Sequence, residues 1–232
     1  MNKHLLLPLL AITFLSSCSI FQNGTLTRGS LYPKMYDEKP LTLLIMPPIN
    51  NTTHVNAKEY MYATLARPLV DKGYYVVSPR LGLEILQNEG AYDAELFVET
   101  PLTSFKKIFN ADAVVFSEIN KWDKQGFGIS MNLHYWIKST TSNEILFERT
   151  CDLYLDLSSN SNSSGSNNSF LGALIDLTVS AINTAVTEEV VAARKANVYV
   201  FQDIPRGKYS PEYGEDKNVG ADKQDISITI SQ

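Results

Sequence analysis

Cys18 is the residue whose type and position most directly indicate a chemical reaction. The chain has 232 residues and two cysteines, and Cys18 follows an almost wholly apolar run, residues 5–15, that begins just after Lys3. A signal peptidase requires small side chains beside the bond that it cleaves, and Ser16 and Ser17 supply them. A thiol is also the nucleophile that accepts a diacylglyceryl group. The pattern therefore predicts cleavage before Cys18 and lipid attachment at its sulfur.

The segment LSSC, residues 15–18, resembles the bacterial lipobox. The apolar run is too short to span a bilayer, which takes about 20 residues, but it fits the h-region of a secretory signal, which has about 7–15 residues. Residues 1–17 are therefore predicted to be a lipoprotein signal peptide. The alternatives are an ordinary signal peptide and a buried N-terminal strand with a chance cysteine. A mature bacterial lipoprotein typically carries three acyl chains such as palmitate, and two or more chains give stable anchoring. By resemblance to the enterobacterial sorting rule, an Asp directly after the lipidated cysteine would keep a lipoprotein out of the outer membrane. Ser19 stands at that position and therefore favours the outer membrane.

The second cysteine, Cys151, is the residue that could serve catalysis. It lies in the alternating stretch ERTCDLYLDL, residues 148–157, and a lone cysteine usually behaves as a small buried hydrophobic residue. An envelope hydrolase that uses Cys151 with a histidine is the alternative. The histidines outside the signal peptide are His54 and His134, and neither has metal-ligand spacing with another histidine or cysteine.

Other catalytic and cofactor motifs are missing from the sequence. It has no G-x-S-x-G elbow, no P-loop and no paired-carboxylate motif, and Gly126 and Gly128 alone do not make a dinucleotide fingerprint. We therefore expect no catalytic site, no cofactor and no metal. The net charge of −5 and the lack of a basic stripe argue against a nucleic-acid surface. Contact with a membrane is expected through the lipid.

The loop at residues 47–53 is the candidate binding site. It follows an apolar strand, and open α/β sheets bind ligands at the carboxyl ends of their parallel strands. Its side chains offer hydrogen-bond donors and acceptors without charge. The alternative is a proline-stiffened turn that leads into the next helix. The candidate binding residues are Pro47, Pro48, Asn50, Asn51 and Thr52.

The elements that would position these residues alternate between strand and helix patterns. Helical crossovers between the first three strands predict that those strands are parallel, and two long alternating strands then form an antiparallel meander. The order β-α-β-α-α-β-β-β-α predicts an α/β fold with a mixed sheet of about five strands and helices packed on it. The predicted strands are 41–46, 74–78, 111–122, 129–139 and 144–157. The predicted helices begin near Asn56 (with Glu59 as capping-box partner), Pro79, Thr100 and Phe170.

One domain is expected between a tether and a tail. The Ser/Asn/Gly segment within the domain is predicted to be a mobile loop. The helix at about 170–197 is predicted to belong to the core, because Asp176 and Asn183 interrupt a transmembrane pattern. The expected boundaries are 1–17 for the signal peptide, 18–40 for the lipid-anchored tether, 41–204 for the single α/β domain, 158–169 for the mobile loop and 205–232 for a disordered tail.

Three segments in this order resemble a family of bacterial outer-membrane lipoproteins that includes a meningococcal genome-derived vaccine antigen. They are LLIMPPINNTT, DKGYYVVSP and NADAVVFSEINKW, the last leading to a meander that ends SNEILFER. The layout is also similar to the TolB N-terminal domain and to the periplasmic domain of the curli secretion lipoprotein CsgG. The family's activity is not established. The resemblance implies an accessory role in envelope assembly or secretion beside CsgG-like lipoproteins.

The sequence thus favours a lipid-anchored, non-enzymatic binding module on the periplasmic side of the outer membrane. Its expected partners are the membrane, through the lipid on Cys18, and envelope or secretion proteins, with a homodimer as a further expectation. The alternatives are the hydrolase and a structural or antigenic protein at the cell surface.

Overall fold

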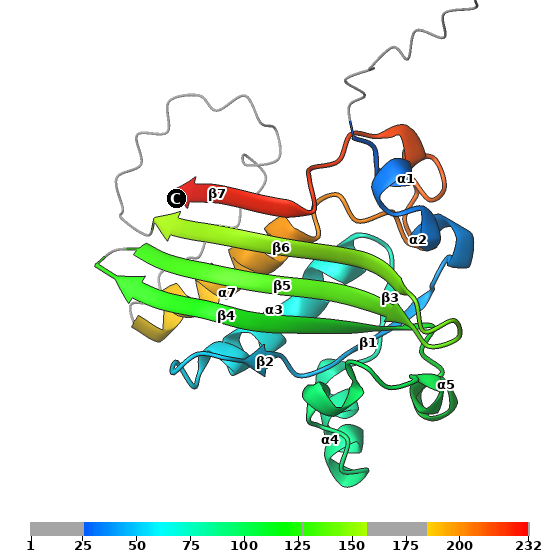
Figure 1. The fold of residues 1–232 in the computed structure, drawn as a ribbon, viewed down its shortest axis with the longest axis horizontal. Coiled ribbons are helices and arrows are strands. Elements are labelled where there is room, and N and C mark those ends of the chain that lie inside the picture. The colour runs from blue at the N-terminus through cyan, green and yellow to red at the C-terminus, as the bar shows by residue number, and fades with distance from the viewer. Residues whose placement is uncertain (1–25, 127, 157–184, 232) are drawn as a thin grey trace, which may run out of the picture.

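The structure is a computed structural model that describes residues 26–126, 128–156 and 185–231. The described elements are arranged around one mixed sheet (Figure 1) with the strand order β3-β1-β4-β5-β6-β7, and β2 pairs with β4 off this path. The predicted α/β fold with a mixed sheet is confirmed. The described part of the sheet has seven strands where about five were predicted, because β2 and β7 were not foreseen.

The three long strands form the antiparallel meander that the sequence predicted. β4 pairs antiparallel with β5, and β5 pairs antiparallel with β6. The shorter β1 pairs parallel with both β3 and β4, and β7 pairs parallel with β6. The strands are β1 Thr42–Ile45, β2 Ile49–Asn50, β3 Tyr75–Val76, β4 Ala113–Gln125, β5 Gly128–Ser139, β6 Ile145–Asp156 and β7 Asp225–Ser231.

The helices lie close to where their patterns predicted them. Asn56 precedes the helix α3 but makes no side-chain cap hydrogen bond, so the predicted capping box is wrong. Its φ of −74° and ψ of −13° are helical, whereas a side-chain cap uses an extended N-cap residue. The helices are α1 Arg28–Leu31, α2 Pro33–Glu38, α3 Ala57–Asp71, α4 Pro79–Asn88, α5 Thr103–Phe109 and α7 Ala185–Val200, with short 3₁₀ turns η1 Ala94–Phe97 and η2 Asp216–Asn218.

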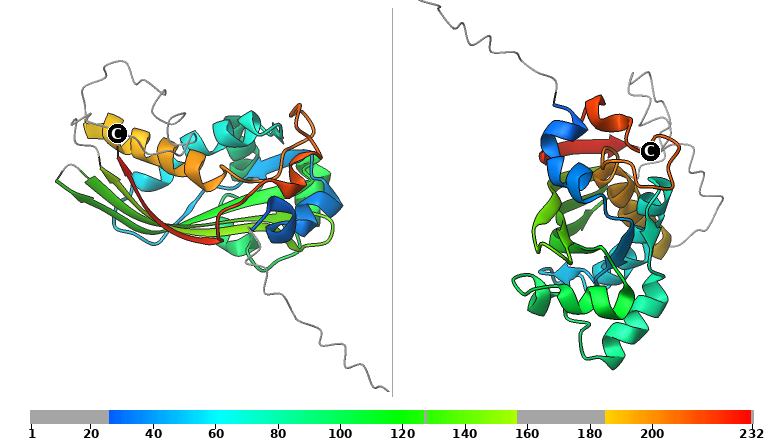
Figure 2. Two further views of the ribbon diagram at one scale, coloured as in Figure 1. Left: turned by 90° about the horizontal axis from the view of Figure 1, so that it is seen from above. Right: turned by 90° about the vertical axis from the view of Figure 1, so that its right-hand side faces the viewer.

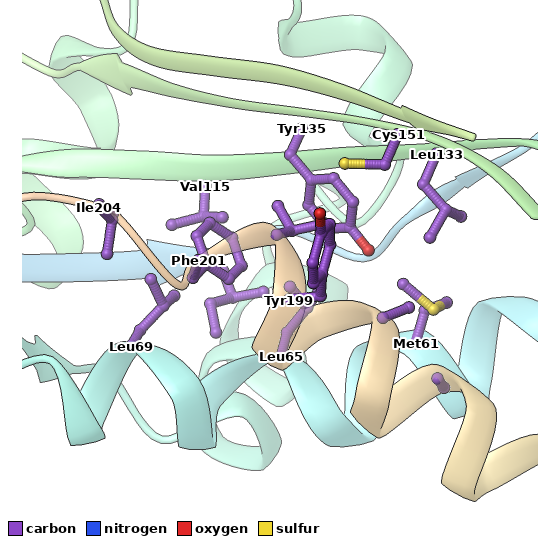
Figure 3. Packing of buried hydrophobic residues seen from close by; sticks show 14 of the residues in the cluster. Met61, Leu65, Leu69, Val115, Leu133, Tyr135, Cys151, Tyr199, Phe201 and Ile204 are labelled. Carbon is purple, nitrogen blue, oxygen red and sulfur yellow. The ribbon is translucent and has the colours of Figure 1, made fainter. Parts of the chain in front are cut away.

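The inner face of the sheet is the face that α3 and α7 cover (Figure 2). Alternate residues of the long strands point into this layer, where they join the larger hydrophobic core. Figure 3 shows Leu133 and Tyr135 of β5 beside Cys151 of β6, facing Met61 of α3. Asn197 of α7 accepts a hydrogen bond from the Tyr135 hydroxyl at 2.7 Å and donates one to the Met61 carbonyl at 3.1 Å. Asn197 therefore joins both helices to the sheet through buried hydrogen bonds.

The outer face of the sheet is only partly covered. A smaller hydrophobic cluster joins α4, η1 and α5 to the outward residues of β1 and to one end of β4 and β5. Phe116 and Trp136 mark the limit of this cluster, with ring centroids 5.3 Å apart and planes within 5°. Away from α4, η1 and α5, no described helix lies over the outer face (Figure 2). We call this uncovered part of β4, β5, β6 and β7 the open face.

The tail expected to be disordered is instead part of the fold. Residues 205–231 include η2 and β7, and Ile230 of β7 is 2% exposed. The tether is also partly folded, because residues 28–38 form α1 and α2, with Tyr32 and Met35 buried. An ion pair connects the N-terminal and C-terminal segments, because the Arg28 guanidinium lies 2.9 Å from the Asp216 carboxylate. The predicted mobile loop 158–169 and most of the predicted helix 170–197 lie outside the described residues.

Arg149 connects the end segments to the sheet. It lies on β6, is 0% exposed, and pairs with the Asp203 carboxylate. Its guanidinium also donates to the Val200 carbonyl at 2.9 Å and to the Tyr32 hydroxyl at 2.6 Å. Burial alone would lower the pKa of Arg149, but the bond to Asp203 outweighs it and the pKa is raised. The buried charge is thus compensated by partners from both ends of the chain.

Candidate functional site

Cys151 does not form a catalytic pair with His134. Cys151 points into the inner core with 0% exposure. Its partner in the β5–β6 register is Leu133, so the next residue, His134, points to the opposite face of the sheet. Burial raises the pKa of the Cys151 thiol to about 12. The thiol is therefore protonated at neutral pH, and Cys151 and His134 do not form the catalytic pair that a hydrolase using Cys151 with this histidine would need.

His54 is also engaged elsewhere. Its Nε2 lies 3.2 Å from Glu189 Oε2 on α7, and its ring stands 6.0 Å from Trp122. Among the described residues, no group of three histidine, cysteine, aspartate or glutamate side chains could hold a metal ion.

The candidate loop at residues 47–52 is built largely from its own hydrogen bonds. Pro47 and Pro48 are buried. Asn50 Oδ1 accepts from the Thr52 backbone N–H at 3.1 Å and from the Thr52 hydroxyl at 2.8 Å, and Asn50 Nδ2 donates to the His54 carbonyl at 3.0 Å. This pattern is the asparagine-based turn of a chain reversal. The Asn50 and Thr52 side chains therefore shape the loop.

Asn51 is the exposed residue that connects this loop to the open face. Its Nδ2 donates to Glu118 Oε1 at 2.6 Å and to Asn120 Oδ1 at 2.9 Å. Glu118 Oε2 in turn lies 3.6 Å from His134 Nδ1. The loop that the sequence singled out is thus the rim of a larger polar surface.

His134 lies between two carboxylates on the open face. Its Nε2 is 3.0 Å from Glu148 Oε1 on β6, opposite the contact with Glu118 on β4. Its ring stacks on Trp136, with centroids 4.8 Å apart. The indole fixes the ring at the border of the covered region, and the two carboxylates lie on either side of it. The side chains of this cluster therefore link β4, β5 and β6 on the open face, in addition to the backbone ladders between these strands.

Further along the strands, the open face carries mainly carboxylates and hydroxyl groups. Asn132 Nδ2 donates to Asp152 Oδ1 at 2.7 Å. A shallow depression of about 290 Å³ extends from β4 to β7, and the residues that line it include Lys121, Asp152, Tyr154 and Thr229. By strand alternation and the register of the ladders, the outward polar residues are Glu118, Lys121, Asp123, Gln125, Ser130, Asn132, His134, Glu148, Thr150, Asp152, Tyr154, Asp156, Asp225, Ser227 and Thr229.

Tyr154 has its place because Gly128 has no side chain. A Cβ on Gly128 would lie 2.2 Å from the Tyr154 hydroxyl oxygen, which is far inside van der Waals contact. The aromatic ring therefore lies across the β5 backbone, 38% exposed. Six of the outward residues are acidic and Lys121 is the one lysine among them. Such a face can attract cations and accept hydrogen bonds from a partner.

Sequence reasoning named His134 and Asn51 but not the surface that unites them. The alternation of residues 129–139 and 148–156 indicates which side chains share a face. It does not tell which part of that face a helix covers, because α4 and α5 come from distant parts of the chain.

Comparison with known proteins adds the family. The model of one protein family, described as "Putative lipoprotein GNA1162-like", matches residues 31–202. The chain belongs to this family. A curated relative from Neisseria meningitidis serogroup B, named "Putative lipoprotein NMB1124/NMB1162", is 26% identical over 200 residues, which are 85% of this chain and 89% of the relative.

Two solved structures are similar to this GNA1162-like chain. The lipoprotein GNA1162 from Neisseria meningitidis has a TM-score of 0.47 and 23% identity, over 59% of this chain and 94% of that chain. The LpoB C-terminal domain from Escherichia coli has a TM-score of 0.34 and 16% identity, over 53% of this chain and 94% of that chain.

The chain is thus a member of a lipoprotein family, while Cys18 lies outside the described residues. No helix in the described part of the GNA1162-like chain is long and apolar enough to cross a membrane.

Proposed function

We propose that this protein is a non-enzymatic accessory module of the cell envelope, held by lipid on Cys18 at the periplasmic side of the outer membrane. The module binds an envelope or secretion protein through the open face. Membership of a lipoprotein family and the LSSC segment before an apolar run support the anchor. The partner that we propose is a CsgG-like secretion lipoprotein. This choice rests on the resemblance of LLIMPPINNTT, DKGYYVVSP and NADAVVFSEINKW to the outer-membrane lipoprotein family.

The observation that carries the binding role is the composition of the open face. Three long strands and β7 present carboxylates, hydroxyls, an amide and an aromatic ring where no described helix packs. A partly charged face on a rigid sheet can select a partner without moving. Asn51 of the candidate loop forms its rim and is available to a partner at the edge, whereas Pro47 and Pro48 are buried and Asn50 and Thr52 shape the loop behind it.

The absence of an accessible nucleophile at Cys151 supports a role in binding over the hydrolase. The thiol is enclosed by Leu133 and Tyr135 (Figure 3), and a buried protonated thiol reacts poorly.

The binding role is tested by recovering partners from solubilised envelopes with matched charge variants. Asp123→Lys with Asp152→Lys reverses two exposed charges on the open face. Glu59→Lys with Glu84→Lys makes the same charge change on α3 and α4, away from it. We expect the first pair to abolish recovery of the partner and the second pair to retain it. Equal recovery by both pairs would overturn the open face as the binding surface.

The anchor is tested separately by mass spectrometry of the native protein. We expect a chain that begins at Cys18 and carries acyl chains. A chain that retains residues 1–17, or an unmodified Cys18, would remove the anchor from the proposal. Protease treatment of intact cells then distinguishes the two sides of the membrane, because a periplasmic domain should be protected and a surface-exposed domain should be degraded.

A further inference from the structure

The strand β7 forms one edge of the sheet (Figure 1). No described residue pairs with its outer side. An edge strand presents a row of unsatisfied backbone donors and acceptors, which proteins usually protect with lysine, proline, a bulge or a short strand. β7 has seven residues, Asp225–Ser231, with the sequence DISITIS. It contains neither lysine nor proline, and its pairing with β6 has no register shift and therefore no bulge.

The direction of the free backbone groups follows from the ladder between β6 and β7. The Thr150 N–H donates to the Gln224 carbonyl at 2.9 Å, and Thr150 is aligned with Asp225. In a parallel ladder, alternate residues of each strand turn their N–H and C=O groups to the same neighbour. Ile226, Ile228 and Ile230 therefore turn theirs toward β6. Asp225, Ser227, Thr229 and Ser231 turn theirs outward.

We propose that two copies of this chain pair antiparallel through β7, with Ile228 of one copy opposite Ile228 of the other. The pairing joins the two sheets into one. This inference is independent of which partner the open face binds.

The sequence of β7 is self-complementary in this register. Ile226 lies opposite Ile230 of the second copy, so isoleucines meet isoleucines on the inner face. Ser227 lies opposite Thr229 of the second copy, so hydroxyls meet hydroxyls on the outer face. Asp225 lies opposite Ser231 of the second copy, so the two acidic side chains stand at opposite ends of the ladder. No like charges oppose each other.

The backbone pattern fits the same register. The residues with outward groups form the hydrogen-bonded pairs, and Ile228 forms a non-hydrogen-bonded pair at the two-fold axis. Each hydrogen-bonded pair exchanges two bonds, which gives about eight backbone hydrogen bonds in all. Because the axis is perpendicular to the sheet, the inner faces of both copies lie on one side. The two open faces then lie on the other side as one surface.

Disulfide cross-linking of the full chain in detergent tests the register. Residues in a non-hydrogen-bonded antiparallel pair have Cα atoms about 4.5 Å apart, which lies within the range of a disulfide. Ile228→Cys should therefore cross-link two identical copies. Ile226→Cys and Ile230→Cys should cross-link to each other when the two proteins are mixed, and each should remain largely uncross-linked alone. Tyr75→Cys, an exposed site on the opposite edge strand β3, is the matched control.

A proline variant tests the ladder itself. Ser227→Pro removes an N–H that points outward and leaves the N–H groups directed to β6 in place. We expect sedimentation equilibrium to give a dimer for the parent chain and a monomer for Ser227→Pro, with an unchanged circular dichroism spectrum. A monomeric parent chain, or cross-linking of Ile228→Cys no faster than that of Tyr75→Cys, would overturn the proposal.

Discussion

The inner face and the open face are made by alternate residues of the same strands, yet they have opposite chemistry. On β5, Met131, Leu133 and Tyr135 are at most 2% exposed, while Asn132 and His134 between them remain partly accessible. The inner face is closed by two helices, and Asn197 and Arg149 form hydrogen bonds within it. The open face holds its charges in water. Stability therefore resides on one face of the sheet, and the other face is free to carry a binding surface.

The largest expected effect comes from breaking the buried ion pair of the inner face. Arg149→Ala leaves the Asp203 carboxylate, in a side chain only 7% exposed, without its counter-charge. Breaking a buried pair from one side costs about 3–5 kcal/mol, so urea unfolding should show a loss of that size. Lys34→Ala is the control, because its pair with Glu144 is exposed on both sides (44% and 54%), and such pairs contribute about 0–1 kcal/mol. Similar losses for both variants would show that the closed face does not concentrate stability.

The thiol on the inner face gives the next largest effect. The pKa of Cys151 is raised to about 12 from its usual 9.0, so its thiolate fraction at pH 8 should be about 1,000-fold lower than that of an unperturbed thiol. In a Cys18→Ser chain, alkylation of the remaining thiol by iodoacetamide should be slower than in urea by at least this factor. Rapid alkylation of the folded chain would restore Cys151 as a possible nucleophile.

Adjacent residues of β5 provide the sharpest comparison of the two faces. Leu133 is 0% exposed on the inner face, and Leu133→Ala should lower the free energy of unfolding by about 3 kcal/mol through lost burial and a cavity. Asn132→Ala changes the preceding residue on the open face and should cost less than about 1 kcal/mol. Both values come from denaturant midpoints at unchanged m-value. A large loss at Asn132 would mean that the open face is covered in solution.

Local sequence patterns were sufficient to predict the long strands of the sheet. Contacts between residues far apart in the sequence decide which face of the sheet the helices cover. Period-two alternation over residues 129–139 and 148–157 was sufficient to predict β5 and β6. The same alternation occurs in DISITIS, but β7 lies among polar residues that resemble a disordered tail, and its strand depends on pairing with β6. The ion pair of Arg28 with Asp216 joins residues 188 positions apart. No local pattern carries such information. The open face likewise depends on where α4 and α5 pack, so its residues were predictable and its exposure was not.

Lys72, on the helix side of the sheet, should make the free energy of unfolding depend on pH. Burial lowers the pKa of Lys72 to about 8 from 10.5, so above pH 8 the folded chain loses a proton that the unfolded chain keeps. The unfolded state then binds more protons, and stability rises with pH. We expect the free energy of unfolding to rise from pH 8 to 9, and this rise should disappear in Lys72→Met. Lys121→Met, the same charge change at an exposed residue of the open face, is the control and should retain the rise. Loss of the rise in both variants would assign it to net charge.

The smallest effect on stability is expected at Gly128, where the open face is positioned. Gly128→Ala adds a Cβ that would overlap the hydroxyl end of the Tyr154 ring. Because this exposed ring can turn away, the free energy of unfolding should change by less than about 1 kcal/mol. Partner recovery should nevertheless fall, because the ring leaves its place on the open face. A double-mutant cycle isolates this coupling. If Gly128 acts through Tyr154, adding Gly128→Ala to Tyr154→Ala should change recovery no further. A further fall in the double variant would mean that the β5 backbone at Gly128 contacts the partner directly.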